Sequence, residues 1–166
     1  MKTKMNAMVI MAFFAACGTP KQENTTEETA TTEVAAEPVN EKDEVVEAYI
    51  KVKDALVATD MESTKNAAEA LHHTVMSDES LKSLADATMA VAQGEDIEAQ
   101  RVAFQTLTAE FISYAKTSNP SVKLYVQFCP MAFDNTGANW VSTSSEIRNP
   151  YFGDKMLKCG RVDEEI

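Results

Sequence analysis

The sequence predicts an all-α protein: an up-down bundle of about four helices, with a short extended stretch and a long irregular C-terminal tail packed on it. Three observations predict this class. Apolar residues recur at helical spacing in four successive segments of residues 40–117. Only a few residues separate these segments, which makes neighbouring helices antiparallel. Each segment follows a residue type that commonly caps a helix N-terminus, namely Asn40, Asp60, Asp78 and Asp96.

Each helix has its own signals. The first is expected from the Asn40 cap to about Ala58, with acidic residues in its opening turn, where negative charge suits the helix dipole. The second covers "MESTKNAAEALHHTVM", residues 61–76. The third is expected over residues 81–93, and Gly94 ends it. The fourth is expected over about residues 96–117.

The pattern changes after Asn119-Pro120. Apolar and polar residues alternate in "SVKLYVQF", residues 121–128, which is typical of a strand-like or extended stretch. Residues 129–160 combine Asn, Gly, Pro and Ser with scattered aromatics and two cysteines, and they are predicted to form an irregular tail. A loop of this length in a compact domain is usually functional or cross-linked.

The start of the chain predicts its compartment. "MKTKMNAMVIMAFFAAC" has two lysines, an apolar run and small residues before a cysteine, as a secretory signal peptide does. Its ending resembles a bacterial lipobox, which implies cleavage after residue 16 and a lipid on Cys17; an ordinary signal peptide is the alternative. Residues 17–39, rich in Thr, Glu and Ala, are predicted to be a flexible acidic linker, and residues 40–166 the helical domain. The expected location is the bacterial cell envelope, lipid-anchored on the periplasmic face of the outer membrane, with surface exposure left open.

Composition and motifs exclude several functions. The formal net charge of −11 repels phosphate backbones, so no nucleic-acid partner is expected. The chain has only 5 glycines, no Gly-rich phosphate loop and no G-x-S-x-G motif. We therefore expect a protein that is not an enzyme.

Soft ligands are the most informative residues. Thiolate, thioether and imidazole groups together suit Cu(I) or Ag(I) rather than Mg²⁺ or Ca²⁺. The candidate metal ligands are Cys129, Met131, Met156 and Cys159 in the tail, and His72 and Met76 four residues apart on the second helix, with His73 pointing nearer to solvent.

Each candidate has another interpretation. In an oxidising compartment Cys129 and Cys159 also predict a disulfide, and the sequence leaves the two alternatives open. The methionines also suit packing, and His72 suits a hydrogen-bonded residue at the edge of the core. Trp140 is expected to be buried, with its indole N–H bound to a carbonyl.

The tail carries a resemblance. "YVQFCPMAFDNTGANWVS" followed by "EIRNPYFGDKMLKCG" resembles the C-terminal signature of a family of domains of unknown function, found in envelope lipoproteins and as a terminal module on periplasmic adaptors of copper/silver efflux pumps. "YIKVKDALVATD" and "DIEAQRVAF" resemble its first and last helix motifs, so the resemblance covers about residues 44–162. Members of the family that this tail resembles often have His directly before Cys-Pro-Met, where this chain has Phe128. If that His is a ligand in them, the site is weaker or altered here unless His72 or His73 replaces it.

The resemblance implies a function and a geometry. It implies handling of monovalent copper or silver, with Cys129, Met131, Met156 and Cys159 as ligands. We expect a membrane-tethered metal-binding lipoprotein that supplies a heavy-metal efflux adaptor or another envelope protein; the alternative is a disulfide-stapled interaction module. The turn at Asn149-Pro150 is predicted to bring Cys159 beside Cys129, with Asp154 capping a short helical turn and Tyr151, Phe152 and Trp140 excluding water.

Overall fold

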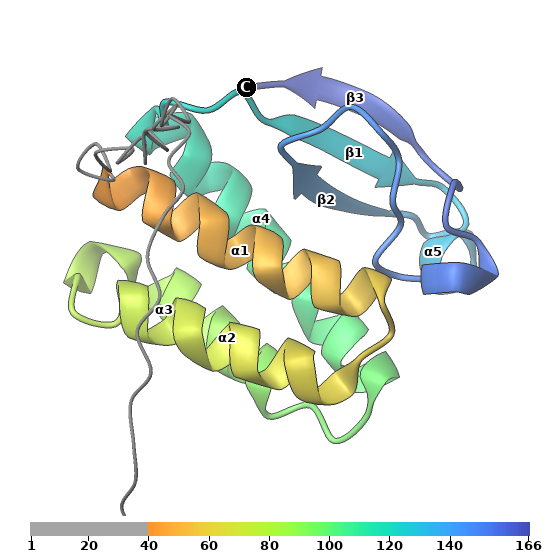
Figure 1. The fold of residues 1–166 in the computed structure, drawn as a ribbon, viewed down its shortest axis with the longest axis horizontal. Coiled ribbons are helices and arrows are strands. Elements are labelled where there is room, and N and C mark those ends of the chain that lie inside the picture. The colour runs from red at the N-terminus through yellow and green to blue at the C-terminus, as the bar shows by residue number, and fades with distance from the viewer. Residues whose placement is uncertain (1–39) are drawn as a thin grey trace, which may run out of the picture. The chain divides into compact units, whose positions relative to one another are not determined.

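A computed structural model describes residues 40–166 of the chain. The predicted signal peptide, the lipidation site Cys17 and the acidic linker all lie outside these residues. In the described part, α1 (Glu41–Val57), α2 (Met61–Val75), η1 (Glu79–Leu81), α3 (Lys82–Ala92) and α4 (Ile97–Ser118) come first. The tail then forms β1 (Tyr125–Cys129), α5 (Ala132–Asn135), β2 (Ala138–Ser142), η2 (Gly153–Lys155) and β3 (Arg161–Glu165) (Figure 1). None of the helices in residues 40–166 has the length and apolarity needed to cross a membrane.

The predicted helix caps are confirmed. Each capping side chain accepts a backbone N–H from the first turn and so satisfies a donor that has no partner within the helix. The caps of α1, α2, η1 and α4 are Asn40, Asp60, Asp78 and Asp96. The third segment differs from its prediction, because Asp78 caps the one-turn η1 and α3 begins only at Lys82.

The helices and the sheet form layers. Consecutive helices pack against each other, and α1 and α4 also contact β2. Figure 1 shows α1 and α4 between the α2–α3 pair and the sheet. The buried ring of Tyr49 stacks on Phe111 with 3.9 Å between centroids, and its hydroxyl accepts the N–H of Val141 at 3.2 Å. This contact fixes the outer edge of β2 to the helices.

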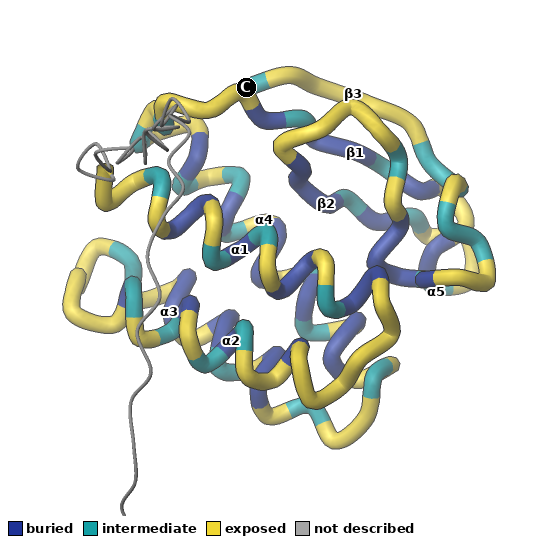
Figure 2. The backbone as a smooth tube through the Cα atoms, viewed as in Figure 1, coloured by how far each residue is buried: buried dark blue, intermediate teal, exposed yellow. Residues whose placement is uncertain are grey.

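The all-α prediction is wrong in one respect, because the tail contains a three-stranded antiparallel sheet of order β2-β1-β3. The predicted extended stretch contains all of β1 except its last residue, Cys129, but β2 and β3 lie in or beyond the part predicted to be irregular. Neither "ANWVS" nor "RVDEE" has a strand-like apolar alternation, and both become strands by pairing with β1. The residues of β3 are exposed along its whole length (Figure 2).

The described residues carry their own hydrophobic core. Residues 40–166 lie in one compact unit, whose buried apolar side chains come from α1 through the tail. A unit with its own core can be prepared without the residues that precede it. A fragment of residues 36–166 also contains only two of the chain's 3 cysteines, Cys129 and Cys159.

Candidate functional site

The two tail cysteines lie together, as the sequence predicts. Cys129 is buried at the end of β1, Cys159 is half-buried, and their sulfurs are 3.2 Å apart. Within residues 40–166 neither cysteine is disulfide-bonded. The pKa of Cys159 is raised by the hydrogen bond it shares with Cys129 and by burial. The site therefore consists of one enclosed thiol and one that solvent can reach.

Asn149 positions the second thiol. Its side chain is fully buried, and its Nδ2 donates to the carbonyl of Cys159 at 2.7 Å while its Oδ1 accepts the N–H of Tyr151 at 2.8 Å. Its own N–H donates to the carbonyl of Leu157 at 2.9 Å. The Asn149 side chain thus joins the start of the loop, in "NPYFG", to its end, in "KCG". The predicted role of Asp154 is wrong: η2 starts one residue earlier, at Gly153, where a positive φ of 56° favours glycine.

Trp140 and Gly160 form the inner wall beside the thiols. Trp140 is paired with Gln127 across the β1–β2 ladder, so its indole lies on the sheet face that also carries Cys129. Gly160 has φ 148°, and a Cβ there would lie 2.7 Å from Cη2 of Trp140. The expected carbonyl partner for the indole is not found: among the described residues nothing accepts from Nε1, and Oε1 of Gln127 also has no donor.

Arg101 has a role that the sequence did not predict. Its guanidinium is buried, and its Nε donates to the carbonyl of Pro150 at 2.9 Å. Nη1 binds Glu98 at 2.8 Å, and Nη2 donates to Oγ1 of Thr59 at 3.1 Å. The side chain therefore joins α4 and the end of α1 to the tail turn that precedes Cys159. A sign of its importance in the sequence is its position within "DIEAQRVAF", one of the motifs that carry the resemblance.

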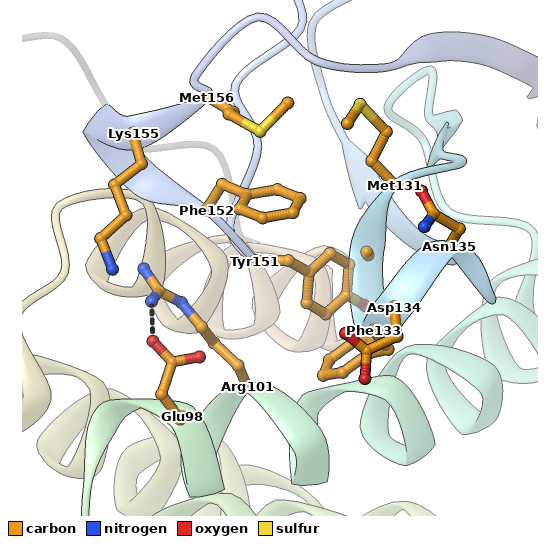
Figure 3. Close-up of a pocket in the computed structure, with 11 residues that line it drawn as sticks. Glu98, Arg101, Met131, Phe133, Asp134, Asn135, Tyr151, Phe152, Lys155 and Met156 are labelled. Carbon is orange, nitrogen blue, oxygen red and sulfur yellow. Dashed lines mark hydrogen bonds and ion pairs between the residues drawn. The ribbon is translucent and has the colours of Figure 1, made fainter.

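A hollow of about 600 Å³ lies between α4 and the tail. Met131, 46% exposed, and Met156, half-buried, lie at the same end of it, and the ring of Phe152 lies below Met156 in the view of Figure 3. Its lining is formed by Glu98, Arg101, Met131, Ala132, Phe133, Asp134, Asn135, Tyr151, Phe152, Lys155 and Met156. The two thioethers thus share one hollow, although Cys129 and Cys159 do not line it.

Part of the lining of this hollow is a left-handed turn. Phe133, Asp134 and Asn135 have φ values of 50°, 55° and 66°, so α5 is not a regular α-helix. Each such residue costs about 1–2 kcal/mol when it is not glycine, so neighbouring contacts must hold the turn. The ring of Phe133 lies edge-on to Tyr151 at 5.2 Å, and the Tyr151 hydroxyl donates to the carbonyl of Asn139.

His72 and Met76 lie elsewhere. They line a separate hollow of about 260 Å³ formed by the end of α2, η1 and α3. Nδ1 of His72 is 3.2 Å from the carbonyl of Ala85, and His73 is exposed. Figure 1 shows α2 and α3 on the side of α1 and α4 that faces away from the sheet. The structure therefore brings the two cysteines together and the two tail methionines together, but it does not bring a histidine to either pair.

The part of the chain that matches known proteins contains the helices but neither of the two tail cysteines. Residues 45–123 match the model of a family described as protein of unknown function, DUF3347. No curated protein and no solved structure matches the chain. The matched residues run from within α1 to just before β1, so both thiols lie beyond them. The chain thus carries a DUF3347 domain of unknown function at residues 45–123.

Proposed function

We propose that the tail binds a monovalent soft metal ion, Cu(I) or Ag(I), through the sulfurs of Cys129 and Cys159. The observation that carries this proposal is the 3.2 Å contact between two sulfurs that are separated by thirty positions of the chain. Thiolate ligands select soft ions. One thiol is half-buried, so an ion has a path from solvent to the enclosed one.

The geometry fits an ion held between the sulfurs. With metal–sulfur bonds of about 2.3 Å, the length found for zinc thiolates, one ion can contact two sulfurs up to about 4.6 Å apart. The observed separation of 3.2 Å lies within that reach. The ligands are thiolates, so an arriving ion displaces the thiol protons. Because the pKa of Cys159 is raised, binding should strengthen as pH rises.

Met131 and Met156 are proposed as outer ligands on the entry side. Met131 follows Cys129 by two residues, and the N–H of Cys159 donates to the carbonyl of Met156 at 3.0 Å. Both thioethers reach solvent, so they can meet an ion before the thiols do. Thioethers are soft ligands that do not need to lose a proton.

The setting of the site belongs to the same proposal. A lipid on Cys17 and an acidic linker over residues 17–39 would hold the domain near a membrane of the envelope. Tethering raises the effective concentration of a domain near its partners. The proposed partner is a heavy-metal efflux adaptor or another envelope protein that accepts the ion.

A disulfide is the second candidate state, and the same contact favours it. The two thiols would lose two protons and two electrons to an oxidant such as a small disulfide, which is reduced to two thiols. The tail would then be a stapled element of a protein-interaction module. Thiol titration of the fragment in denaturant, after isolation under oxidising conditions, distinguishes the states: two free thiols favour metal binding and none favours the staple.

The metal proposal is tested by Cu(I) titration of the reduced fragment, residues 36–166, against a chromogenic chelator. We expect the tightest ion to be lost in Cys129→Ser and in Cys159→Ser, and to be weakened in Met131→Leu. Met89→Leu, on α3, is the matched methionine control and should bind as the wild type does. Unchanged Cu(I) affinity in both cysteine variants would overturn the proposal.

A further inference from the structure

We propose that the hollow formed by α2, η1 and α3 is a second soft-metal site, in which Nε2 of His72 and the thioether of Met76 hold a monovalent ion independently of the cysteines. This inference goes beyond the proposed function of the tail. It starts from the separation of the predicted ligands into different layers of the fold.

The imidazole of His72 is arranged as a ligand. Nδ1 is 3.2 Å from the backbone carbonyl of Ala85. A carbonyl only accepts hydrogen bonds, so Nδ1 carries the proton and the neutral ring keeps its lone pair on Nε2. A histidine that binds a metal through one nitrogen commonly donates the other N–H to a carbonyl, which fixes the ring. The contact also spans from α2 to α3, so the hollow has a rigid wall.

Met76 supplies the second donor. It follows His72 by four residues, and helical geometry continues to it, because its N–H donates to the carbonyl of His72 at 2.9 Å. Residues at this spacing share one helix face. The Met76 side chain is 55% exposed and lines the same hollow, so packing in the core does not explain it.

The charge around the hollow favours a cation. Asp78, Glu79 and Asp86 line it together with a single lysine, Lys82, whose ammonium is 2.9 Å from Asp86. The carboxylate of Asp78 is held in place because the N–H and the hydroxyl of Ser80 both donate to its Oδ1, at 2.8 and 2.7 Å. Clustered negative charge raises the local concentration of cations.

The ligand set selects a soft monovalent ion. Over residues 40–166 no group of three or more His, Cys, Asp or Glu residues is placed to hold a metal, so a zinc-type set of protein ligands is not offered there. One imidazole and one thioether suit Cu(I) or Ag(I). The domain would then carry two ions, one in the tail and one at His72.

The test uses the fragment of residues 36–166 with Cys129→Ser and Cys159→Ser, so the outcome does not depend on whether the tail binds metal. Silver nitrate is the probe, and the imidazole nitrogens are followed by ¹H–¹⁵N NMR, since the chain has only 2 histidines. We expect one equivalent of Ag(I) to shift Nε2 of His72. His72→Gln and Met76→Leu should each weaken binding about tenfold or more.

His73→Gln is the matched control, because His73 is adjacent, exposed and outside the lining of the hollow. Ag(I) affinity should be unchanged in this variant. Equal shifts of both histidines, an equal loss in His73→Gln, or no shift at all would overturn the proposal. If the double-serine fragment does not fold, Ag(I) stoichiometry of the reduced wild type decides: Met76→Leu must remove one equivalent and His73→Gln none.

Discussion

The half-buried thiol of Cys159 sets the pH at which the cysteine pair can react. Its pKa is raised first by the hydrogen bond with Cys129 and then by burial. Because the thiolate is the reactive form, we predict that alkylation of Cys159 by iodoacetamide reaches its midpoint at a higher pH than alkylation of an unhindered cysteine peptide. Cys129→Ala removes the main cause and should lower this midpoint. Alkylation rates of the fragment from pH 6 to 10, read by mass spectrometry, check this, and identical midpoints in the two proteins would contradict it.

Gly160 is the residue whose small size matters most beside the thiols. A Cβ would lie 2.7 Å from Cη2 of the buried Trp140 and 3.0 Å from the carbonyl of Phe128, on a backbone with φ 148°. Gly160→Ala should therefore lower the free energy of unfolding by about 1–3 kcal/mol through overpacking and strain. The same displacement should weaken Cu(I) binding, because it moves Cys159. Urea unfolding followed by Trp140 fluorescence measures the first effect, and a stability within about 0.5 kcal/mol of wild type would refute it.

At the scale of elements, the helices could be predicted from the sequence and the sheet could not. A helix is specified locally, and Asn40, Asp60 and Asp96 each bind within the turn that they begin. The strand β3 is specified by pairing with β1 more than thirty residues earlier, and its residues "RVDEE" carry no apolar alternation. The left-handed conformation of Phe133 also has no signal in its own residue type, because only its surroundings make it tolerable.

The candidate site, too, has features that could be predicted locally and features that depend on long-range contacts. The cysteines were found from their chemistry and from the motifs around them. Asn149 was predicted as part of a turn, but its side-chain bonds to Cys159 and Tyr151 were not, and Arg101 was not predicted at all, because these contacts depend on partners that only the fold supplies. The reactive groups and the turn between them could therefore be predicted from the sequence, but the side-chain contacts that hold them in place could not.

Arg101 connects three elements, and its removal should loosen the tail. Arg101→Leu leaves the carbonyl of Pro150 and the hydroxyl of Thr59 without their donor. The carbonyl of Pro150 lies at a buried residue, and an unpaired buried group costs about 1–3 kcal/mol, whereas Thr59 is exposed and its hydroxyl can bond to water. We therefore predict a loss of about 1–3 kcal/mol in the free energy of unfolding. Trp140 fluorescence should change at a lower urea concentration than the helical circular dichroism signal, because the tail detaches first.

The matched control for this variant is Glu98→Gln. The carboxylate of Glu98 is 65% exposed, so its ion pair with Arg101 should contribute less than about 1 kcal/mol. Arg101→Lys keeps the charge but loses the fork of donors, and it should be intermediate. If Glu98→Gln were as destabilising as Arg101→Leu, the contacts with the tail would not be the cause.

At the scale of the whole molecule, the helices and the tail have separate roles. The residues that match the DUF3347 model form the helical layers, whereas both thiols lie in the tail that packs on α4 and α1. The helical layers thus provide a scaffold that holds the tail in one conformation. The proposed second site at His72 lies within the matched residues, outside the tail, so it can be tested separately from the cysteines.

Oxidation should change the stability of the whole domain. Closing a loop of about 30 residues between Cys129 and Cys159 stabilises a fold by about 3.5 kcal/mol on the chain-entropy model. We predict an increase of this order in the free energy of unfolding when the reduced fragment is treated with oxidised glutathione, measured by urea unfolding with Trp140 fluorescence. The fragment with both cysteines changed to serine should show no change. No increase in the free energy of unfolding of the wild-type fragment would mean that the disulfide does not form. An equal increase in the serine fragment would mean that the stabilisation has another cause. Cu(I) at a hundredfold excess over the dissociation constant of the cysteine site should stabilise the reduced protein by about 2.7 kcal/mol more than it stabilises the oxidised protein, because oxidation consumes the two thiols but leaves the proposed His72 site intact.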